Sequence, residues 1–569
     1  MLSLLHSKRF SISPYGLCIC ALIAAATLAR FILIYFNWPV TNSDEGNMGL
    51  IALHIAYQGD HPTFFYGLPY MGPLEGYIAA PLFLLFGPSL FALRLGLLPL
   101  FTLFLICMYY LTRLLYSKGL ALFIVVLFSL GSADVIIRQL KAVGEYPEIE
   151  LFAALISLLA AWLALSHPSS DTHPATWLKW RRILVYSLLG LIVGLALWVD
   201  FLILPFVVTA GLLLFLFCRR ELFSWSGLSL LLGTIIGAFP LIYYNLTAPP
   251  GENSLNTLLL IHQADAAGGL TQHVSLLKQI FSTIMIGLPL TTGANPRCSG
   301  ATLASFGSPT SSMLPCEIFH GGWSMGFLVL WTGATFLATA FIWQRHHQGS
   351  ACNWSFEQRQ DVVRQCCRLM LLISAGLTIV LYAASPLAAL YPFTAFRYLT
   401  CVLIAAPAVL WPLWMGIRKL EIAPTMRAKA AFILKGSILL FIGVTFLLGT
   451  VRTFQEIPAA QAAYASEDTL VRDLLHNGAT YIYSDYWTCN RLIFHSHEQI
   501  ICSVLTEELK PGFNRYTPYV PVVKAAPHPA YVFALGSPFA TAFEQRILSQ
   551  HHYQRHTSKG YVIYQEDSS

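Results

Sequence analysis

Charged side chains are scarce in this sequence. Aspartate, glutamate, lysine and arginine together make up 11% of the 569 residues, whereas 56% are apolar. A soluble domain needs a charged surface and carries about a quarter charged residues. Most of the surface of this chain must therefore face lipid, which excludes an ordinary soluble enzyme. The 34 lysines and arginines are also dispersed rather than gathered on one face, which argues against a nucleic-acid partner.

Several other patterns are missing. The chain has no internal repeat, no low-complexity segment and no cysteine spacing typical of a zinc site. The first apolar stretch, 15–36, is too long for a signal-peptide core and lacks a cleavage site, so it predicts a retained span. Cys298 with Cys316, and Cys489 with Cys502, are expected outside the membrane. Each pair could form a disulfide in an oxidising compartment, and small buried hydrophobes are the alternative.

Apolar runs long enough to cross about 30 Å of hydrocarbon recur along the chain. They are 15–36, 89–112, 118–137, 148–166, 183–200, 201–218, 225–246, 323–343, 369–390, 398–417 and 430–450. The apolar stretch 73–87 is shorter and ends at a Gly-Pro pair. If 73–87 does not cross, the strongly basic loops all fall on one side, as the positive-inside rule requires, and if it crosses, the bias reverses. The basic residues in these inner loops are Lys8, Arg9, Arg113, Lys118, Lys179, Arg181, Arg182, Arg219, Arg220, Arg345, Arg359, Arg364, Arg368, Arg418, Lys419, Arg427 and Lys429.

The sequence therefore predicts an α-helical polytopic membrane protein with about eleven spans. Its amino terminus is expected in the cytoplasm and its carboxyl terminus outside, across an inner (plasma) membrane. A membrane domain, 1–450, would carry outer loops at 37–88, 138–147 and 247–322. A small extracytoplasmic α/β domain would follow at 451–569. It is expected to hold a helix at 459–476 and strands at 481–483, 491–494, 531–533 and 561–564.

The first outer loop places two acids directly after the first span. Asn42 or Ser43 can cap a helix that carries Asp44 and Glu45 in its first turn. Acids also favour helix amino termini for purely structural reasons, and this is the alternative. A carboxylate beside a low-dielectric wall is, however, a competent general base for a hydroxyl group.

The second outer loop is short and densely charged. It holds two cations, Arg138 and Lys141, and two acids, Glu145 and Glu148. The cations depart from the positive-inside pattern. An anionic ligand at the interface would explain them, and lipid headgroups are the alternative.

Further charges are expected at the same level of the membrane. Asp200 lies at a tight outer hairpin, and Arg397 precedes a span. Arg30 and Arg94 lie near the outer ends of their spans, where snorkelling to the headgroups is the preferred interpretation. Acids and cations that converge at one level suit a reaction with a phosphate leaving group.

These residues resemble bacterial family-39-like glycosyltransferases. That group lies in the GT-C superfamily, with protein O-mannosyltransferases and the aminoarabinose transferase that acts on lipid A. The segments that carry the resemblance are Asn42-Ser43-Asp44-Glu45-Gly46, 64–77, 86–89, 144–148, Trp198-Val199-Asp200 and Arg397-Tyr398-Leu399. The similarity covers most of the membrane region and weakens after residue 250. Many relatives carry Lys-Pro-Pro where this chain has Met71-Gly72-Pro73.

The resemblance implies inverting transfer from a polyprenyl-phosphate sugar to a glycan, lipid or protein acceptor. Asp44 would be the base, with Glu45 beside it, and Glu145 and Glu148 would complete the polar site. The residues that would bind the lipid phosphate or substrate are Arg138, Lys141, Arg397, Tyr398, Asp200 and Glu75. No cofactor is assigned. The acidic loops could bind a divalent cation, but the sequence contains no recognisable set of metal ligands.

Three other functions fit parts of the sequence. A transporter or lipid flippase is the main alternative, although such proteins often show repeated halves with ionisable groups near the midplane. A polymerase or ligase of preassembled glycans would use similar outer chemistry in a larger cleft. A non-catalytic membrane scaffold is the third.

Overall fold

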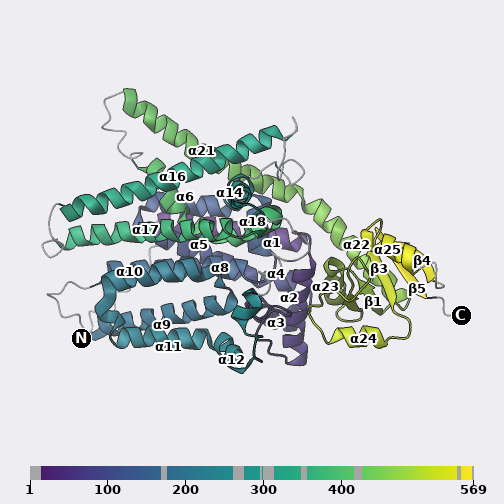
Figure 1. Cartoon of the computed structure of the whole chain (residues 1–569). Coiled ribbons are helices and arrows are strands. Elements are labelled where there is room, and N and C mark those ends of the chain that lie inside the picture. The colour runs from purple at the N-terminus through teal and green to yellow at the C-terminus, as the bar shows by residue number, and fades with distance from the viewer. Residues whose placement is uncertain are drawn as a thin grey trace, which may run out of the picture.

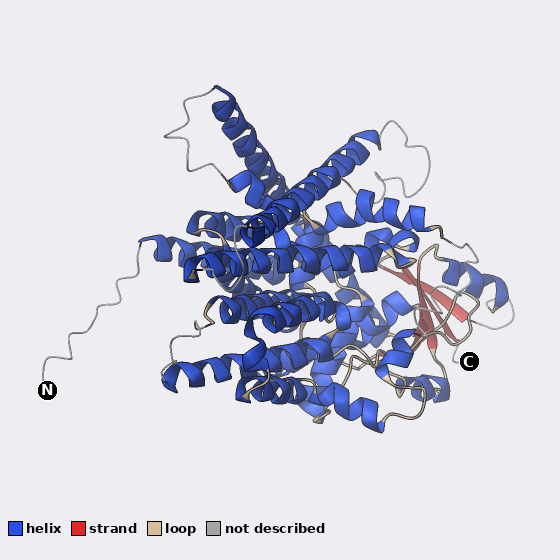
Figure 2. Ribbon diagram, turned by 60° about the vertical axis from the view of Figure 1, so that its left-hand side comes forward, coloured by secondary structure: helices blue, strands red, loops and turns tan. Residues whose placement is uncertain are grey.

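A computed structural model of the chain describes residues 14–167, 176–259, 274–294, 298, 313–347, 355–415, 426–547 and 553–566. Four of the basic residues used to orient the chain, Lys8, Arg9, Arg418 and Lys419, lie outside these ranges, as do the parts 260–273, 295–297 and 299–312 of the expected loop 247–322. The described part consists of a large bundle of helices with a small sheet-containing unit at one end (Figures 1 and 2).

The bundle is built from long apolar helices that run side by side (Figure 1). Within the described residues, nine helical stretches are long and apolar enough to cross a membrane, or up to eleven when each of two bent helix pairs counts as one span. This agrees with the expected eleven and makes the chain an integral membrane protein. The main helices are α1 (Pro14–Tyr35), α5 (Leu97–Leu115), α8 (Tyr146–Leu165), α9 (Thr176–Val199), α10 (Leu204–Leu222), α16 (Leu314–His347), α17 (Phe356–Ala383), α20 (Ala406–Trp414) and α21 (Met426–Gln455).

Two expected spans are broken helices. The segment 118–137 forms α6 (Lys118–Ser129) and α7 (Ala133–Leu140), bent by 86°, and 225–246 forms α11 (Trp225–Gly237) and α12 (Phe239–Thr247), bent by 63°. At the first break, the Gly131 N–H donates to the Thr450 hydroxyl at 2.9 Å. A side chain of α21 thus satisfies a backbone group that the break frees inside the bundle.

A third expected span, 398–417, also departs from a regular α-helix. Its first part is a 3-10 helix, Phe396–Ala405, which continues into α20. Pro407 and Pro412 remove backbone donors from this stretch. The irregular segment carries Arg397 and Tyr398. Long 3-10 stretches are uncommon and often mark functional or strained regions.

Helices α9 and α11 approach each other unusually closely. A Cβ atom added to Gly190 would lie 2.1 Å from the Leu230 carbonyl oxygen, and one added to Gly237 would lie 2.3 Å from that of Leu191. Only glycine permits such contact between two helix backbones, as is common between membrane helices.

Short helices connect the spans at the end of the bundle that faces the sheet-containing unit. They are α2 (Ser43–Leu53), a π-helix (His54–Gln58), α3 (Leu74–Phe86) and α4 (Leu90–Leu95). The side chain of Asn42 caps α2 by accepting a hydrogen bond from the Glu45 N–H at 3.1 Å. Helix α3 has 13 residues, fewer than the roughly 20 that a spanning helix needs. Further short elements are α14 (Leu276–Ser282), a π-helix (Thr283–Gly287), α15 (Leu288–Thr291), α18 (Leu387–Leu390), α19 (Pro392–Ala395) and a 3-10 turn at Phe201–Ile203.

The carboxyl-terminal unit is a five-stranded mixed sheet with helices, joined to the bundle through α22 (Ile457–His476). The strand order is β2-β1-β3-β5-β4; β1 pairs in parallel with β2 and β3, and β5 pairs antiparallel to β3 and β4. The strands are β1 (Tyr481–Ser484), β2 (Ile501–Val504), β3 (Ala530–Ala534), β4 (Tyr553–Ser558) and β5 (Tyr561–Glu566). The helices are α23 (Tyr486–His495), α24 (Tyr519–Ala525) and α25 (Pro538–Arg546). The expected small α/β fold at the carboxyl end is confirmed.

The strand expected at 491–494 is wrong, because this segment lies in α23. Asp485 caps that helix by accepting hydrogen bonds from the N–H groups of Trp487 and Thr488. The buried residues Leu492, Ile493 and Phe494 pack against neighbouring elements, so tertiary contact decides the structure of a short apolar run.

Helix α23 packs directly against α2 (Figure 1). A Cβ atom on Gly46 would lie 2.5 Å from the Asn490 carbonyl oxygen, and the Asn490 side chain donates to the Ser43 hydroxyl at 3.0 Å. This contact holds the carboxyl-terminal unit against the helix that carries Asp44 and Glu45.

Candidate functional site

A cavity of about 510 Å³ lies where the helical bundle meets the carboxyl-terminal unit. Five residues singled out from the sequence line it: Asp44, Glu145, Asp200, Arg397 and Tyr398. They come from segments far apart in the chain. Leucines of α10 and α17 line another part of the wall, so the cavity combines an ionisable face with an apolar one.

Asp44 contacts two residues of the carboxyl-terminal unit. Its Oδ1 accepts hydrogen bonds from the Tyr486 hydroxyl at 2.5 Å and from Nη2 of Arg515 at 3.0 Å. Its Oδ2 receives no hydrogen bond from the part of the chain that the structure describes. One carboxylate oxygen is therefore held by the protein, and the other is available to a substrate.

Glu45 points away from this cavity and is fully buried. It accepts two hydrogen bonds from Arg94, at 2.7 and 2.6 Å, and a third from the Ala142 N–H at 3.2 Å. The side chains of neighbouring residues in a helix point in directions about 100° apart, so the two adjacent acids contact different parts of the protein. Glu45 thus joins α2 to α4 and to the loop that contains Ala142.

The second loop turns sharply at Gly144 and Glu145, with φ angles of +88° and +74°. Positive φ is uncommon for a residue other than glycine, and it occurs here at a residue that lines the cavity. The Gly144 N–H donates to Oε2 of Glu75 at 2.7 Å. Glu75 therefore lies behind the turn and supports it.

The remaining acids lie around this turn. Burial, and then the neighbouring charge of Glu148, hold the pKa of Glu75 well above its usual range. Glu148 is itself fully buried and lies outside the cavity lining. At the cavity, burial and then the charge of Glu145 hold the pKa of Asp200 well above its usual range. A raised pKa is expected for a buried carboxyl group that lies beside a second acid.

The cations predicted to bind an anion take different positions. The guanidinium groups of Arg138 and Arg397 both lie over the ring of Tyr146, with centroid distances of 5.4 and 5.9 Å. Arg397 lines the cavity, whereas Arg138 lies behind it, and each has a buried Nε without a hydrogen-bond partner among the described residues. Lys141 does not line the cavity. Burial lowers its pKa to about 8, against the opposing charge of Glu45.

Arg30 and Arg94 do not snorkel, so that interpretation was wrong. Both side chains are fully buried. Arg30 donates to the Ser129 carbonyl oxygen at 2.5 Å and to Oε1 of Gln139 at 3.0 Å. Each arginine therefore finds its partners inside the bundle, which costs less than an unpaired charge there.

Sequence reasoning missed Tyr486 and Arg515. Burial, and then the charge of Asp44, raise the pKa of Tyr486, so its hydroxyl remains a neutral donor. Arg515 lines the cavity from a loop between β2 and α24. No spacing or motif connects residue 515 with residue 44; only the packing of α23 on α2 brings them together.

One possible metal-ligand group occurs within the described ranges, and it lies elsewhere. His167, Cys218 and Glu221 hold potential ligand atoms within 4.8 Å of one another. Glu221, however, accepts two hydrogen bonds from Arg182, at 2.8 and 2.6 Å. The guanidinium already neutralises that carboxylate, so these residues form a structural ion-pair cluster.

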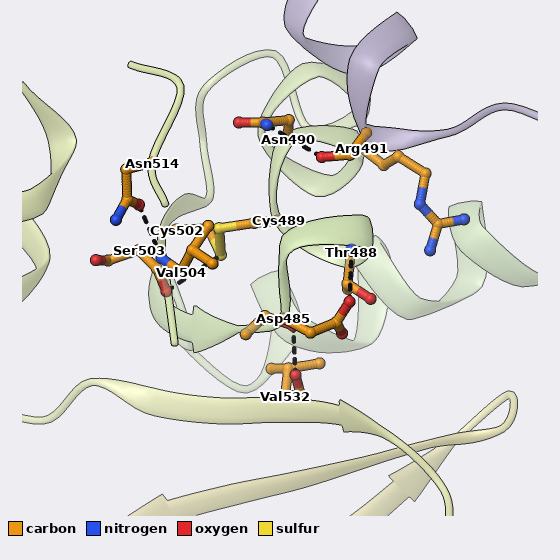
Figure 3. Close-up of a disulfide and its surroundings, with 12 residues drawn as sticks. Asp485, Thr488, Cys489, Asn490, Arg491, Cys502, Ser503, Val504, Asn514 and Val532 are labelled. Atoms are coloured by element: carbon orange, nitrogen blue, oxygen red, sulfur yellow. Dashed lines mark hydrogen bonds between the residues drawn. A yellow bond between two sulfur atoms is a disulfide. The ribbon is translucent and has the colours of Figure 1, made fainter. Parts of the chain in front are cut away.

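Both cysteine pairs considered from the sequence form disulfides. Cys298 bonds to Cys316, and Cys489 bonds to Cys502, joining α23 to β2 (Figure 3). The second bond lies in the unit that presents Tyr486 and Arg515 to the cavity.

No protein-family model and no curated sequence matches the chain. Its fold is similar to that of ArnT from Cupriavidus metallidurans bound to undecaprenyl phosphate, with a TM-score of 0.54, 14% identity, and coverage of 97% of this chain and 98% of ArnT. The apo form of ArnT gives a TM-score of 0.51 at 14% identity, covering 96% and 97%. The oligosaccharyltransferase AglB from Archaeoglobus fulgidus gives 0.49 at 13% identity, covering 97% of this chain and 74% of AglB. The GT-C-like membrane fold expected from the sequence is confirmed.

Proposed function

We propose that this protein transfers a glycosyl group from a polyprenyl-phosphate donor to an acceptor hydroxyl at the outer face of the membrane. The observation that carries the proposal is one cavity lined by Asp44, Glu145 and Arg397, with an apolar wall beside them. An apolar wall suits an isoprenoid chain, and charged groups suit a phosphate and a nucleophile. The fold of ArnT, whose structure contains undecaprenyl phosphate, supports the same class of donor.

The proposed orientation places the cavity and the carboxyl-terminal unit outside. It rests on the distribution of lysine and arginine, which assigns the loops 37–88, 138–147 and 247–322 to the outer side. In this arrangement residues 1–450 form the membrane domain and 451–569 the extracytoplasmic domain. The inner (plasma) membrane of a bacterium would be the location, with the amino terminus in the cytoplasm.

The proposed chemistry is a single displacement. The acceptor oxygen attacks the anomeric carbon and forms the new glycosidic bond. At the same time the bond from that carbon to the phosphate oxygen breaks, and its electron pair leaves with the lipid phosphate. Attack opposite to the leaving group inverts the anomeric centre. The acceptor proton goes to Oδ2 of Asp44, the oxygen without a protein donor in the described structure.

Other residues of the cavity take supporting roles in this proposal. Arg397 neutralises the charge that develops on the leaving phosphate. Glu145 and Asp200 bind sugar hydroxyls, and Tyr398 lines the same region. Four residues lie behind the cavity wall and support the residues that line it. They are Glu75, Arg138, Lys141 and Glu148. Glu45 holds the two loops together.

Asp44→Asn tests the proposal directly. The purified protein would be incubated with radiolabelled undecaprenyl-phosphate hexoses and pentoses and with membrane extracts as acceptor source. We expect transfer to fall by about 10²–10⁴-fold, the usual contribution of a positioned base. Asp361→Asn, at an inner surface pair with Arg364, is the matched control and should transfer normally. Near-wild-type turnover by Asp44→Asn would remove Asp44 from the mechanism.

The same assay separates the alternatives. Movement of the labelled lipid-linked sugar across the vesicle membrane, without cleavage of the bond between sugar and phosphate, would indicate a transporter or flippase. Use of an oligosaccharide carrier in place of a monosaccharide carrier would indicate a polymerase or ligase.

A further inference from the structure

The loop between β2 and α24 lies outside the bundle of membrane helices and contributes a cationic side chain to the cavity. Arg515 lines the cavity, and its side chain is 10% exposed. Its guanidinium lies over the rings of Phe65 and Phe513, at 5.2 Å from each centroid. It is therefore held between an aromatic side chain of the first outer loop and one of its own loop.

The hydrogen bonds of Arg515 leave one of its nitrogens unused. Nε donates to the Tyr486 hydroxyl at 2.7 Å, and Nη2 donates to Oδ1 of Asp44 at 3.0 Å. Nη1 is buried and has no hydrogen-bond partner in the described structure. A buried guanidinium nitrogen without an acceptor is costly, and an oxygen of a bound ligand could supply the missing acceptor.

The loop is fixed firmly enough to position this side chain. The Val504 N–H donates to Oδ1 of Asn514 at 2.8 Å, which ties the residue before Arg515 to β2 (Figure 3). The Cys489–Cys502 bond joins β2 to α23, the helix that carries Tyr486. The group that reaches Asp44 is thus part of a cross-linked unit.

We propose that Arg515 binds the phosphate of the donor and that this phosphate competes with Asp44 for the guanidinium. The proposal rests on the proposed function and adds an order of events to it. Without donor, Arg515 and Asp44 are paired. A bound phosphate provides a second anionic acceptor and accepts a hydrogen bond from the free Nη1. The guanidinium is then shared with the phosphate, and its ion pair with Asp44 weakens. Because a carboxylate paired with a guanidinium is a weaker base than an unpaired one, donor binding prepares Asp44 to accept the acceptor proton.

Binding measurements on the full-length protein in detergent test this role. The probes are undecaprenyl phosphate, undecaprenol, which has the same tail without phosphate, and inorganic phosphate. We expect wild type to bind undecaprenyl phosphate at least about tenfold more tightly than undecaprenol. Arg515→Gln should lose most of that preference and keep its affinity for undecaprenol. Arg546→Gln, an exposed arginine of α25 in the same unit, should bind like wild type.

The competition makes a second, less obvious prediction. Asp44→Asn, which removes the competing carboxylate, should bind undecaprenyl phosphate about tenfold more tightly than wild type, the factor that one charge-assisted hydrogen bond contributes. In an Arg515→Gln background the same substitution should give no gain. A gain that persists in the double variant would show plain charge repulsion by Asp44 and would overturn the competition.

Other outcomes separate the two proposals. If Arg397→Gln loses phosphate binding and Arg515→Gln does not, the role of Arg515 is wrong and the proposed function stands. If wild type does not distinguish undecaprenyl phosphate from undecaprenol, the proposed function itself fails. If inorganic phosphate binds as tightly as undecaprenyl phosphate, the claim that the bound phosphate belongs to a lipid donor is wrong. If Arg515→Gln does not fold, Arg515→Lys replaces it and should show an intermediate loss, because lysine keeps the charge but not the guanidinium fork.

Discussion

Arg94 and Glu45 form an ion pair with two hydrogen bonds in which neither side chain has any exposed surface. Glu45 also accepts from the Ala142 backbone, so the pair joins α2, α4 and the second loop. Its neighbour Asp44 contacts the cavity instead. The Asp-Glu sequence thus combines one acid that is paired inside the bundle with one that lines the cavity.

Removal of Glu45 should therefore destabilise the protein. Glu45→Ala leaves the buried Arg94 charge unpaired, and breaking a buried pair in this way usually costs about 3–5 kcal/mol. We expect the midpoint of thermal unfolding to fall clearly, and activity to follow the amount of folded protein. Glu507→Ala, at an exposed site, should leave the midpoint unchanged. A Glu45→Ala protein that melts like wild type but no longer transfers sugar would assign Glu45 to the chemistry.

Glu75 should act through the position of Glu145 rather than through its own charge. Burial and the charge of Glu148 raise the pKa of Glu75, which favours the neutral carboxyl, and its Oε2 accepts a hydrogen bond from the Gly144 N–H. Glu75→Gln retains a neutral acceptor of the same shape, so we expect it to keep most of the transfer rate. Glu75→Ala leaves the Gly144 N–H unsatisfied, at a cost of about 1–3 kcal/mol, and releases the turn. Its transfer rate should fall more steeply than its thermal stability.

Paired measurements of the rate and the melting temperature check this expectation. Glu507→Ala again serves as the control for expression and handling. Equal loss of transfer in Glu75→Gln and Glu75→Ala, with unchanged melting, would instead mean that the charge or proton of Glu75 takes part in the reaction.

Much of the fold could be predicted because lipid imposes a strong constraint on sequence. Apolar runs of sufficient length located the spans, and the shortness of 73–87 agreed with α3, a helix of 13 residues. The breaks at Gly131 and before α12 were not predicted, because their stability depends on partners elsewhere, such as Thr450. The length of an apolar run predicts that a segment crosses the membrane, but it does not predict where the helix breaks or bends.

The candidate site could be predicted in part. The density of charge in the segments 37–88 and 138–147 led to Asp44 and Glu145, and the position of Arg397 before a span led to that cation; all three line one cavity. Charge density alone could not separate Asp44 from Glu45, because the distinction arises from the burial of Arg94. Arg515 carries no local signal, and it acquires its position from a fold that begins more than four hundred residues after Asp44.

The contact between α22 and α23 should depend on pH through His495. Burial lowers the pKa of His495, but hydrogen bonds and charges from Glu467 and Asp468 outweigh it and raise the value above the usual range. The ring nitrogens lie 3.3 Å from Oε1 of Glu467 and 3.5 Å from Oδ1 of Asp468. A histidine whose pKa is higher in the folded state stabilises that state fully below the unfolded pKa of about 6.5, and this stabilisation is lost as the pH rises through the folded value.

Comparison with His495→Gln isolates this contribution. The apparent melting midpoint of wild type should exceed that of the variant most at about pH 5.5, below the unfolded pKa, and the difference should shrink as the pH rises through the folded pKa of His495. His556→Gln, at an exposed position on β4, should show no such trend. Because α23 also carries Tyr486, the contact of that hydroxyl with Asp44 should loosen as the helix does. A difference between wild type and His495→Gln that grows with pH would mean that the histidine is buried as a neutral ring and that the two acids do not hold its proton.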